Sequence, residues 1–137
     1  MKRAVVVANG RLQVEAVLGA LAAAGFEAVA SGSVAEVRSQ VEVGAVAVVL
    51  GASAEAGEAA PAAIGGMPPA IRRSCVVVLL GPGLTTGDGM RAFLLGVDLV
   101  VAAADTARLG ELVGAAVASK RSLVSPLDPV AAAKLGG

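Results

Sequence analysis

The stretch VAVVLGASAE, residues 46–55, decides the fold. It opens with an uninterrupted apolar run over 46–50 and then continues into small residues. An apolar run of this kind is typical of a strand buried on both faces, as in a parallel sheet. Four more runs indicate further strands: AVVVA at 4–8, FEAVA at 26–30, CVVVLL at 75–80 and LVVAA at 99–103.

Segments with helical periodicity separate the expected strands. Apolar residues at the i, i+3, i+4 and i+7 spacing predict the inner faces of two helices: Val14, Val17, Leu18 and Leu21 for the first, and Met90, Phe93, Leu94 and Val97 for the second. A third helix is expected to begin at a capping box formed by Ser33 and Glu36. A last helix, capped by Asp105 or Thr106, is expected to turn inward Leu109, Leu112, Val113 and Ala116.

The alternation of strands and helices predicts an α/β fold. The expected architecture has three layers, with a doubly wound, five-stranded parallel sheet in the flavodoxin-like and receiver-like order 2-1-3-4-5. One domain is expected over residues 1–120. Residues 121–137 contain Pro126, Pro129 and a terminal glycine pair, and are expected to form a tail or the start of a linker.

Composition excludes several function classes. The chain has 11 basic and 11 acidic residues, and Phe26 and Phe93 are its only aromatic residues, which argues against nucleic-acid binding. Mean hydropathy is +0.80, yet no uncharged apolar run approaches the ~20 residues that span a bilayer. One cysteine precludes an intramolecular disulfide and suits a reducing compartment, so a cytoplasmic location is expected.

The sequence offers little material for catalysis. It contains no histidine, the commonest general base near neutral pH. Cys75 begins an apolar strand and is expected to be a core residue. No Cys/His cluster supports zinc. We therefore expect no enzymatic activity, no bound metal and no cofactor.

Two longer segments carry a family resemblance. LGALAAAGFEAVASGSVAEV (18–37) and MRAFLLGVDLVVAAAD (90–105) resemble the corresponding elements of bacterial response-regulator receiver domains, and the similarity covers about residues 3–119. The resemblance implies phosphorylation of an aspartate at the end of the third strand. It also implies a Mg²⁺-binding acidic pair after the first strand, a Thr or Ser after the fourth and a Lys after the fifth.

None of these groups stands in its place here. The corresponding positions hold Asn9 and Gly10, Gly51 and Ser53, Gly81, and Ala104. The first aspartate in the chain is Asp88, and no lysine lies between Lys2 and Lys120. We therefore expect a degenerate, or pseudo-receiver, domain. Glu55 is either a fixed negative charge near the vacant site or an ordinary loop residue.

The loop GPGLTTGDGMR, residues 81–91, has two interpretations. Its glycines and hydroxyls suit a loop that cradles a phosphate or nucleotide at residues 81–89, with Arg11, Gly83, Thr85 and Thr86 as ligand-binding residues. It matches neither the P-loop nor the GxGxxG fingerprint. The other interpretation is a flexible connection that ends in a helix N-cap at Thr86 or Asp88.

A surface for partners is the remaining candidate site. The resemblance places it on the fourth helix, fifth strand and fifth helix, where the candidates are Arg91, Leu95, Asp98, Arg108 and Glu111. The alternative is that these residues only solvate two helices. The favoured hypothesis is a non-catalytic, phosphorylation-independent module in bacterial signalling or cell organisation that binds another protein or itself, as a homodimer. The alternatives are the small-ligand sensor and an inert structural module of a larger assembly.

Overall fold

The structure, a computed structural model, describes residues 2–8, 12–52 and 67–136. Its five parallel strands lie in the order β2-β1-β3-β4-β5, which confirms the predicted flavodoxin-like topology. The strands are β1 (Arg3–Val7), β2 (Glu27–Ser31), β3 (Ala45–Gly51), β4 (Val76–Gly81) and β5 (Leu99–Ala102).

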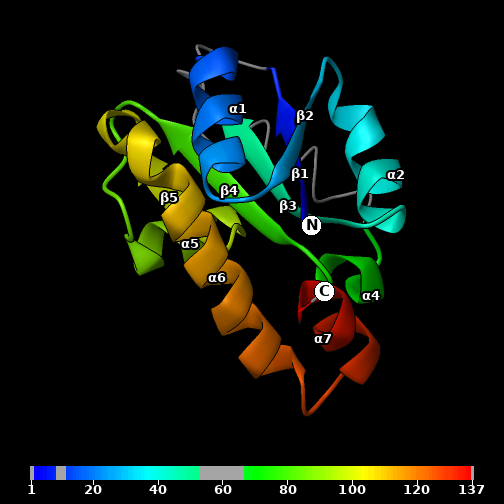
Figure 1. Ribbon diagram of the computed structural model, residues 1–137. Helices are drawn as coiled ribbons and strands as arrows, with labels where there is room; N and C mark the ends of the chain where they lie inside the picture. The colour runs from blue at the N-terminus through cyan, green and yellow to red at the C-terminus, as the bar shows by residue number, and fades with distance from the viewer. Residues whose placement is uncertain (1, 9–11, 53–66, 137) are drawn as a thin grey trace.

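Helices cover both faces of the sheet, so the fold has the three predicted layers (Figure 1). On one face lie α1 (Val14–Ala23) and α6 (Leu109–Val124), and on the other lie α2 (Val37–Glu42) and α5 (Gly89–Leu95). The remaining elements are α4 (Pro69–Arg72), α7 (Pro129–Gly136), and the two 3₁₀ helices η1 (Val34–Glu36) and η2 (Ala103–Arg108). Within the described ranges, no helix combines the length and apolar character that crossing a bilayer requires.

The apolar runs form the core because their side chains alternate between the two faces. In β1, Ala4 and Val6 pack under α1 and α6, whereas Val5 and Val7 pack under α2. All residues of β3 and β4 are buried. Strands without a single polar position cannot leave either face in water, so a helix layer on each side is required.

The prediction that Met90, Phe93 and Leu94 form the inner face of α5 is wrong. Met90, Phe93 and Leu94 are 69%, 80% and 71% exposed. The helix has only seven residues, and it contacts the core through the small side chain of Ala92, which lies opposite Met90 and Leu94, and through the half-buried Leu95. Val97 is buried, but it follows the helix after a left-handed turn at Gly96. The apolar spacing was real, but the helix turns this face toward solvent.

Residues 121–136 form the end of α6, a short turn and α7, in contrast to the expected tail. α6 continues to Val124, and α7 packs back against it, with Ala131, Ala132 and Leu135 buried in the core. The two prolines misled the prediction: Pro129 is the first residue of α7, where the missing N–H costs no hydrogen bond. Asp128 starts this helix by accepting a hydrogen bond from the Ala131 amide at 3.0 Å.

Two of the predicted helix starts also differ. The Ser33 hydroxyl accepts from the Ala35 amide, but the Glu36 carboxylate bonds the Ser31 hydroxyl and does not complete a capping box. Asp105 and Thr106 belong to η2, and α6 begins after Arg108. The prediction of Asp88 as the N-cap of α5 is confirmed, because its carboxylate accepts from the Arg91 amide at 3.1 Å.

Replacing Leu135 tests whether α7 is part of the fold. Leu135→Ala should lower the free energy of unfolding by about 2–5 kcal/mol, because it opens a cavity in the core. The matched control is Leu127→Ala, since Leu127 is 82% exposed in the turn before α7, and its effect should stay within about 0.5 kcal/mol. Urea unfolding measures both. Equal values for the two variants would mean that α7 is not docked in solution.

Candidate functional site

The carboxyl edge of the sheet, where the strands end, is built from small residues. Gly51 ends β3 and Gly81 ends β4, and both are buried. The Ala52 amide continues the pairing by donating to the Leu80 carbonyl at 2.8 Å. A Cβ atom added to Gly81 would lie 2.6 Å from the Cβ atom of Ala52. The chains approach too closely here for a larger side chain at position 81.

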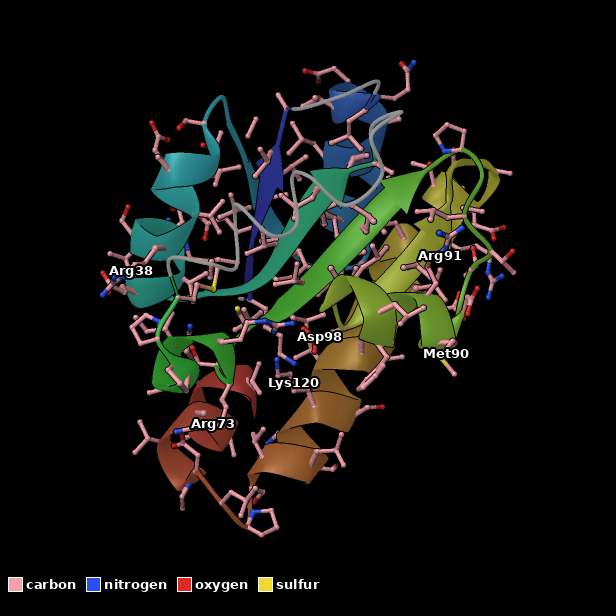
Figure 2. The ribbon with its side chains drawn as sticks, turned by 180° about the vertical axis from the view of Figure 1, so that it is seen from behind. Arg38, Arg73, Met90, Arg91, Asp98 and Lys120 are labelled. Atoms are coloured by element: carbon pink, nitrogen blue, oxygen red, sulfur yellow. The ribbon has the colours of Figure 1, made fainter. Side chains whose placement is uncertain are left out.

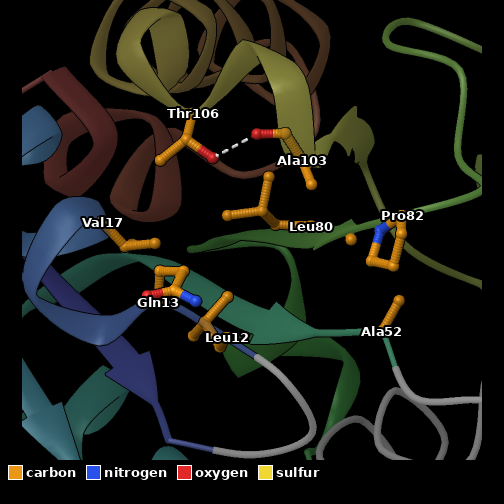
Figure 3. A pocket seen from close by; sticks show the side chains of 9 residues that line it. Leu12, Gln13, Val17, Ala52, Leu80, Pro82, Ala103 and Thr106 are labelled. Carbon is orange, nitrogen blue, oxygen red and sulfur yellow. Dashed lines mark hydrogen bonds between the residues drawn. The ribbon is translucent and has the colours of Figure 1, made fainter.

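A small cavity of about 70 Å³ opens at this edge (Figure 3). Its polar groups are the Gln13 side chain and the Thr106 hydroxyl, which donates to the Ala103 carbonyl at 2.7 Å. The residues that line it are Leu12, Gln13, Val17, Ala52, Leu80, Gly81, Pro82, Ala103 and Thr106, none of them charged. This lining supplies neither carboxylates for a divalent cation nor a cation for a phosphoryl group.

The predicted phosphorylation-site positions are only partly described. Gly51 and Gly81 come together at the carboxyl edge, and Ala104 lies exposed in η2. Asn9, Gly10, Arg11, Ser53 and Glu55 lie outside the described residues. In the part of the chain that the structure describes, no three His, Cys, Asp or Glu side chains gather as a metal site would require.

The glycine-rich loop is fixed along the outer edge of β5. The Thr86 hydroxyl donates to the Asp105 carboxylate and accepts from the Ala102 amide at 2.8 Å. The Gly87 amide donates to the Val100 carbonyl at 3.0 Å, and the Asp88 amide donates to Thr85.

These hydrogen bonds argue against the interpretation of the loop as a phosphate cradle. Gly83 and Thr85 are exposed, and Gly83 has a φ of +79° that favours glycine. The Gly87 and Asp88 amides, which would face a phosphate at the start of α5, donate within the protein instead. The Asp88 carboxylate at the same point would repel an anion.

The predicted partner residues are distributed over α5, β5 and α6. Arg91, Arg108 and Glu111 are exposed, while Leu95 is half-buried and packs against the core. Figure 2 labels Arg91 and Met90, both of which project from α5. Sequence reasoning missed the apolar part of this face because it assigned Met90 and its helical neighbours to the core.

Asp98 belongs to a charged cluster at the amino edge, where the strands begin. Its carboxylate pairs with Arg72 at 2.7 Å and with the Lys120 ammonium at 3.3 Å, and it accepts from the Val77 amide at 2.8 Å. Figure 2 shows Asp98 and Lys120 together beside α6. The Lys120 ammonium also donates to the Cys75 carbonyl at 2.6 Å. The cluster joins α4, β4, β5 and α6. The Asp98 carboxylate is therefore engaged in bonds within the protein, although Asp98 is one of the residues predicted for the partner surface.

Burial shifts the pKa of two groups at this cluster, Lys120 and the neighbouring Cys75. Burial lowers the pKa of Lys120, although the Asp98 carboxylate acts in the opposite direction. Burial raises the pKa of the Cys75 thiol, which keeps it neutral and unreactive. No local spacing links positions 72, 98 and 120, so only the folded topology reveals this cluster.

Removing one hydroxyl tests how firmly the loop is held. Thr86→Val should lower the free energy of unfolding by about 1–3 kcal/mol, because the Ala102 amide and the Asp105 carboxylate both lose their partner. Thr85→Val is the matched control, since Thr85 is exposed. Denaturant unfolding gives the stability, and hydrogen exchange at the Ala102 amide gives the local effect. Unchanged exchange in Thr86→Val would contradict the assignment.

Comparison with known proteins supports the fold. No family model matches the sequence, and no curated protein matches it either. The structure is similar to the crystal structure of a CheY-like protein, TadZ, from Pseudomonas aeruginosa PAO1, with a TM-score of 0.61 and 18% sequence identity. The match covers 85% of this chain and 99% of the TadZ chain. The chain therefore has a receiver-like, CheY-like fold.

Proposed function

We propose that this chain is a non-catalytic, phosphorylation-independent receiver-like module of bacterial signalling or cell organisation, acting in the cytoplasm. It binds another protein, or a second copy of itself, through the face formed by α5, β5 and α6. The observation that carries the proposal is the exposed apolar surface of α5.

Three large apolar side chains on α5 form one continuous patch. Met90, Phe93 and Leu94 are separated by three and four positions, so they are neighbours on the helix surface. Contiguous exposed apolar surface on a folded domain marks interaction sites. Phe and Met, together with Arg, are also the residue types enriched in protein interfaces. Arg91 lies three positions before Leu94, a spacing that makes the two residues neighbours on the helix surface.

A groove of about 450 Å³ lies between α6 and the start of β5, the other two elements of the proposed face. It runs along α6 from Leu112 to Leu123 and includes Leu99 at the start of β5. The loop before α5 already occupies the Val100 carbonyl and the Ala102 amide on the outer edge of β5. A partner strand therefore finds these two groups engaged, which favours docking through side chains.

The carboxyl edge supports independence from phosphorylation. The sequence has no aspartate before Asp88, and the described cavity at this edge has an uncharged lining. We therefore expect beryllofluoride with Mg²⁺, which mimics a phosphoryl group on aspartate, to leave the amide NMR resonances of Gly51, Ala52 and Gly81 unchanged. Saturable shifts at these three amides would contradict independence from phosphorylation.

Charge introduced on α5 tests the partner surface. Phe93→Asp should abolish concentration-dependent self-association in sedimentation equilibrium, because it places a carboxylate in the centre of the patch. Leu127→Asp is the matched control: Leu127 is equally exposed but lies at the turn between α6 and α7.

If the wild-type chain is monomeric, the same pair of variants is applied to a partner co-purified from the native host. Phe93→Asp should lose that partner and Leu127→Asp should retain it. Identical behaviour of the two variants would favour the inert structural module.

A further inference from the structure

A second cavity lies at the amino edge, away from the surfaces described so far. Its volume is about 410 Å³, which is within the range of small-molecule sites. It is enclosed by α2, α4 and α7, and its lining residues are Val41, Glu42, Ala70, Ile71, Ser74, Asp128, Val130, Ala131 and Lys134. None of these residues belongs to the α5–β5–α6 face or to the carboxyl edge.

The ammonium of Lys134 is the central polar group of this cavity. It donates to the Val41 carbonyl at 2.8 Å and to the Ser74 hydroxyl at 2.9 Å. The Ser74 hydroxyl in turn donates to the Ile71 carbonyl at 2.8 Å. An ammonium carries three N–H groups, so these two bonds leave one donor for a ligand.

Lys134 differs from its charged neighbours in its lack of a counterion. Glu42 pairs with Arg38 at 3.1 Å, and Asp128 pairs with Arg73 at 3.1 Å. No carboxylate of the described residues pairs with Lys134. The nearby Cys75 thiol is kept neutral by burial, which raises its pKa. Arg38 and Arg73 lie outside the lining but neutralise its two carboxylates. In the described part of the chain, the charge of Lys134 is therefore the one at this cavity left without a partner of opposite sign.

That charge is partly removed from water. Burial lowers the pKa of Lys134, which means that desolvation disfavours its charged form. An anion placed against the free N–H would offset this cost through a charge-assisted hydrogen bond. Apolar side chains, among them Ile71 and Val130, form most of the remaining wall, and Val130 is 81% exposed. A hydrocarbon chain would cover Val130 and Ile71 and remove apolar surface from water.

We propose that this cavity binds a small apolar carboxylate, with its head group on Lys134 and its hydrocarbon chain against Ile71 and Val130. One ammonium matches one singly charged head group. Glu42 and Asp128 on the same wall repel any anion, but they repel a phosphate dianion more strongly than a singly charged carboxylate, and their pairing with Arg38 and Arg73 weakens the effect. The proposal does not depend on the partner surface, because the two sites share no residue.

Titration with octanoate, followed by amide NMR, tests the site in the wild-type chain. Saturable shifts are expected at Ser74, Ala131 and Lys134. Neutral octanamide should bind about tenfold more weakly, because it lacks the charge-assisted bond. Inorganic phosphate should cause no saturable shift at these residues. Equal affinity for octanoate and octanamide, or octanoate shifts confined to other residues, would overturn the proposal.

A charge-removing variant provides the second arm. Lys134→Met keeps the hydrocarbon stem and should weaken octanoate binding about tenfold, while octanamide binding stays unchanged. Lys2→Met is the control, because Lys2 lies outside this cavity, and it should bind octanoate as the wild type does. Full octanoate affinity in Lys134→Met would overturn the proposal. If Lys134→Met does not fold, the wild-type comparison of octanoate with octanamide decides the question.

Discussion

The central strands must be covered on both faces at once, and the rest of the structure depends on this constraint. Residues 4–7 of β1 and all residues of β3 and β4 are buried, so no side of these strands can face water. Small residues let the helices approach closely enough to seal the sheet. Gly110 of α6 lies against α1, where an added Cβ would collide with Ala20 and Ala24. The same requirement extends to α7, whose Leu135 closes the core under α6.

The sequence predicted the parts of the fold that follow from uninterrupted patterns. Five apolar runs and their helical spacers were enough for the strand order, because right-handed crossovers leave few topologies. The orientation of α5 was not predictable in the same way. Its outward face has the apolar spacing expected of an inner face. The residue of α5 that is buried, Ala92, is small and only weakly apolar, and Leu95 is half-buried beside the core. The α7 helix was missed because two prolines resemble the end of a domain, although Pro129 opens the helix.

The candidate sites also differ in whether the sequence alone could predict them. That no aspartate stands at the ends of the first and third strands follows directly from the sequence, since Asp88 is the first aspartate. The charged clusters at the amino edge could not be predicted in this way, because they join positions that are distant in the chain. Lys120 reaches Asp98 from α6, and Lys134 reaches the Val41 carbonyl across 93 positions. Lys120 and Lys134, the two lysines whose pKa burial lowers, therefore both bond groups at the amino edge of the sheet.

The bonds of the glycine-rich loop connect these observations to the proposed function. Thr86 links the loop to Asp105 in η2 and to the end of β5, and Gly87 continues this link one residue before the N-cap of α5. The start of α5 is thus tied by hydrogen bonds to the strand that it flanks. A movement of the start of α5 away from β5 would break these bonds and leave their half-buried partners, Asp105 and the Ala102 amide, without a donor or acceptor from Thr86. These bonds keep the exposed face of α5 in one position. Under the proposed function, binding therefore depends on the presence of the partner and requires no conformational switch inside this domain.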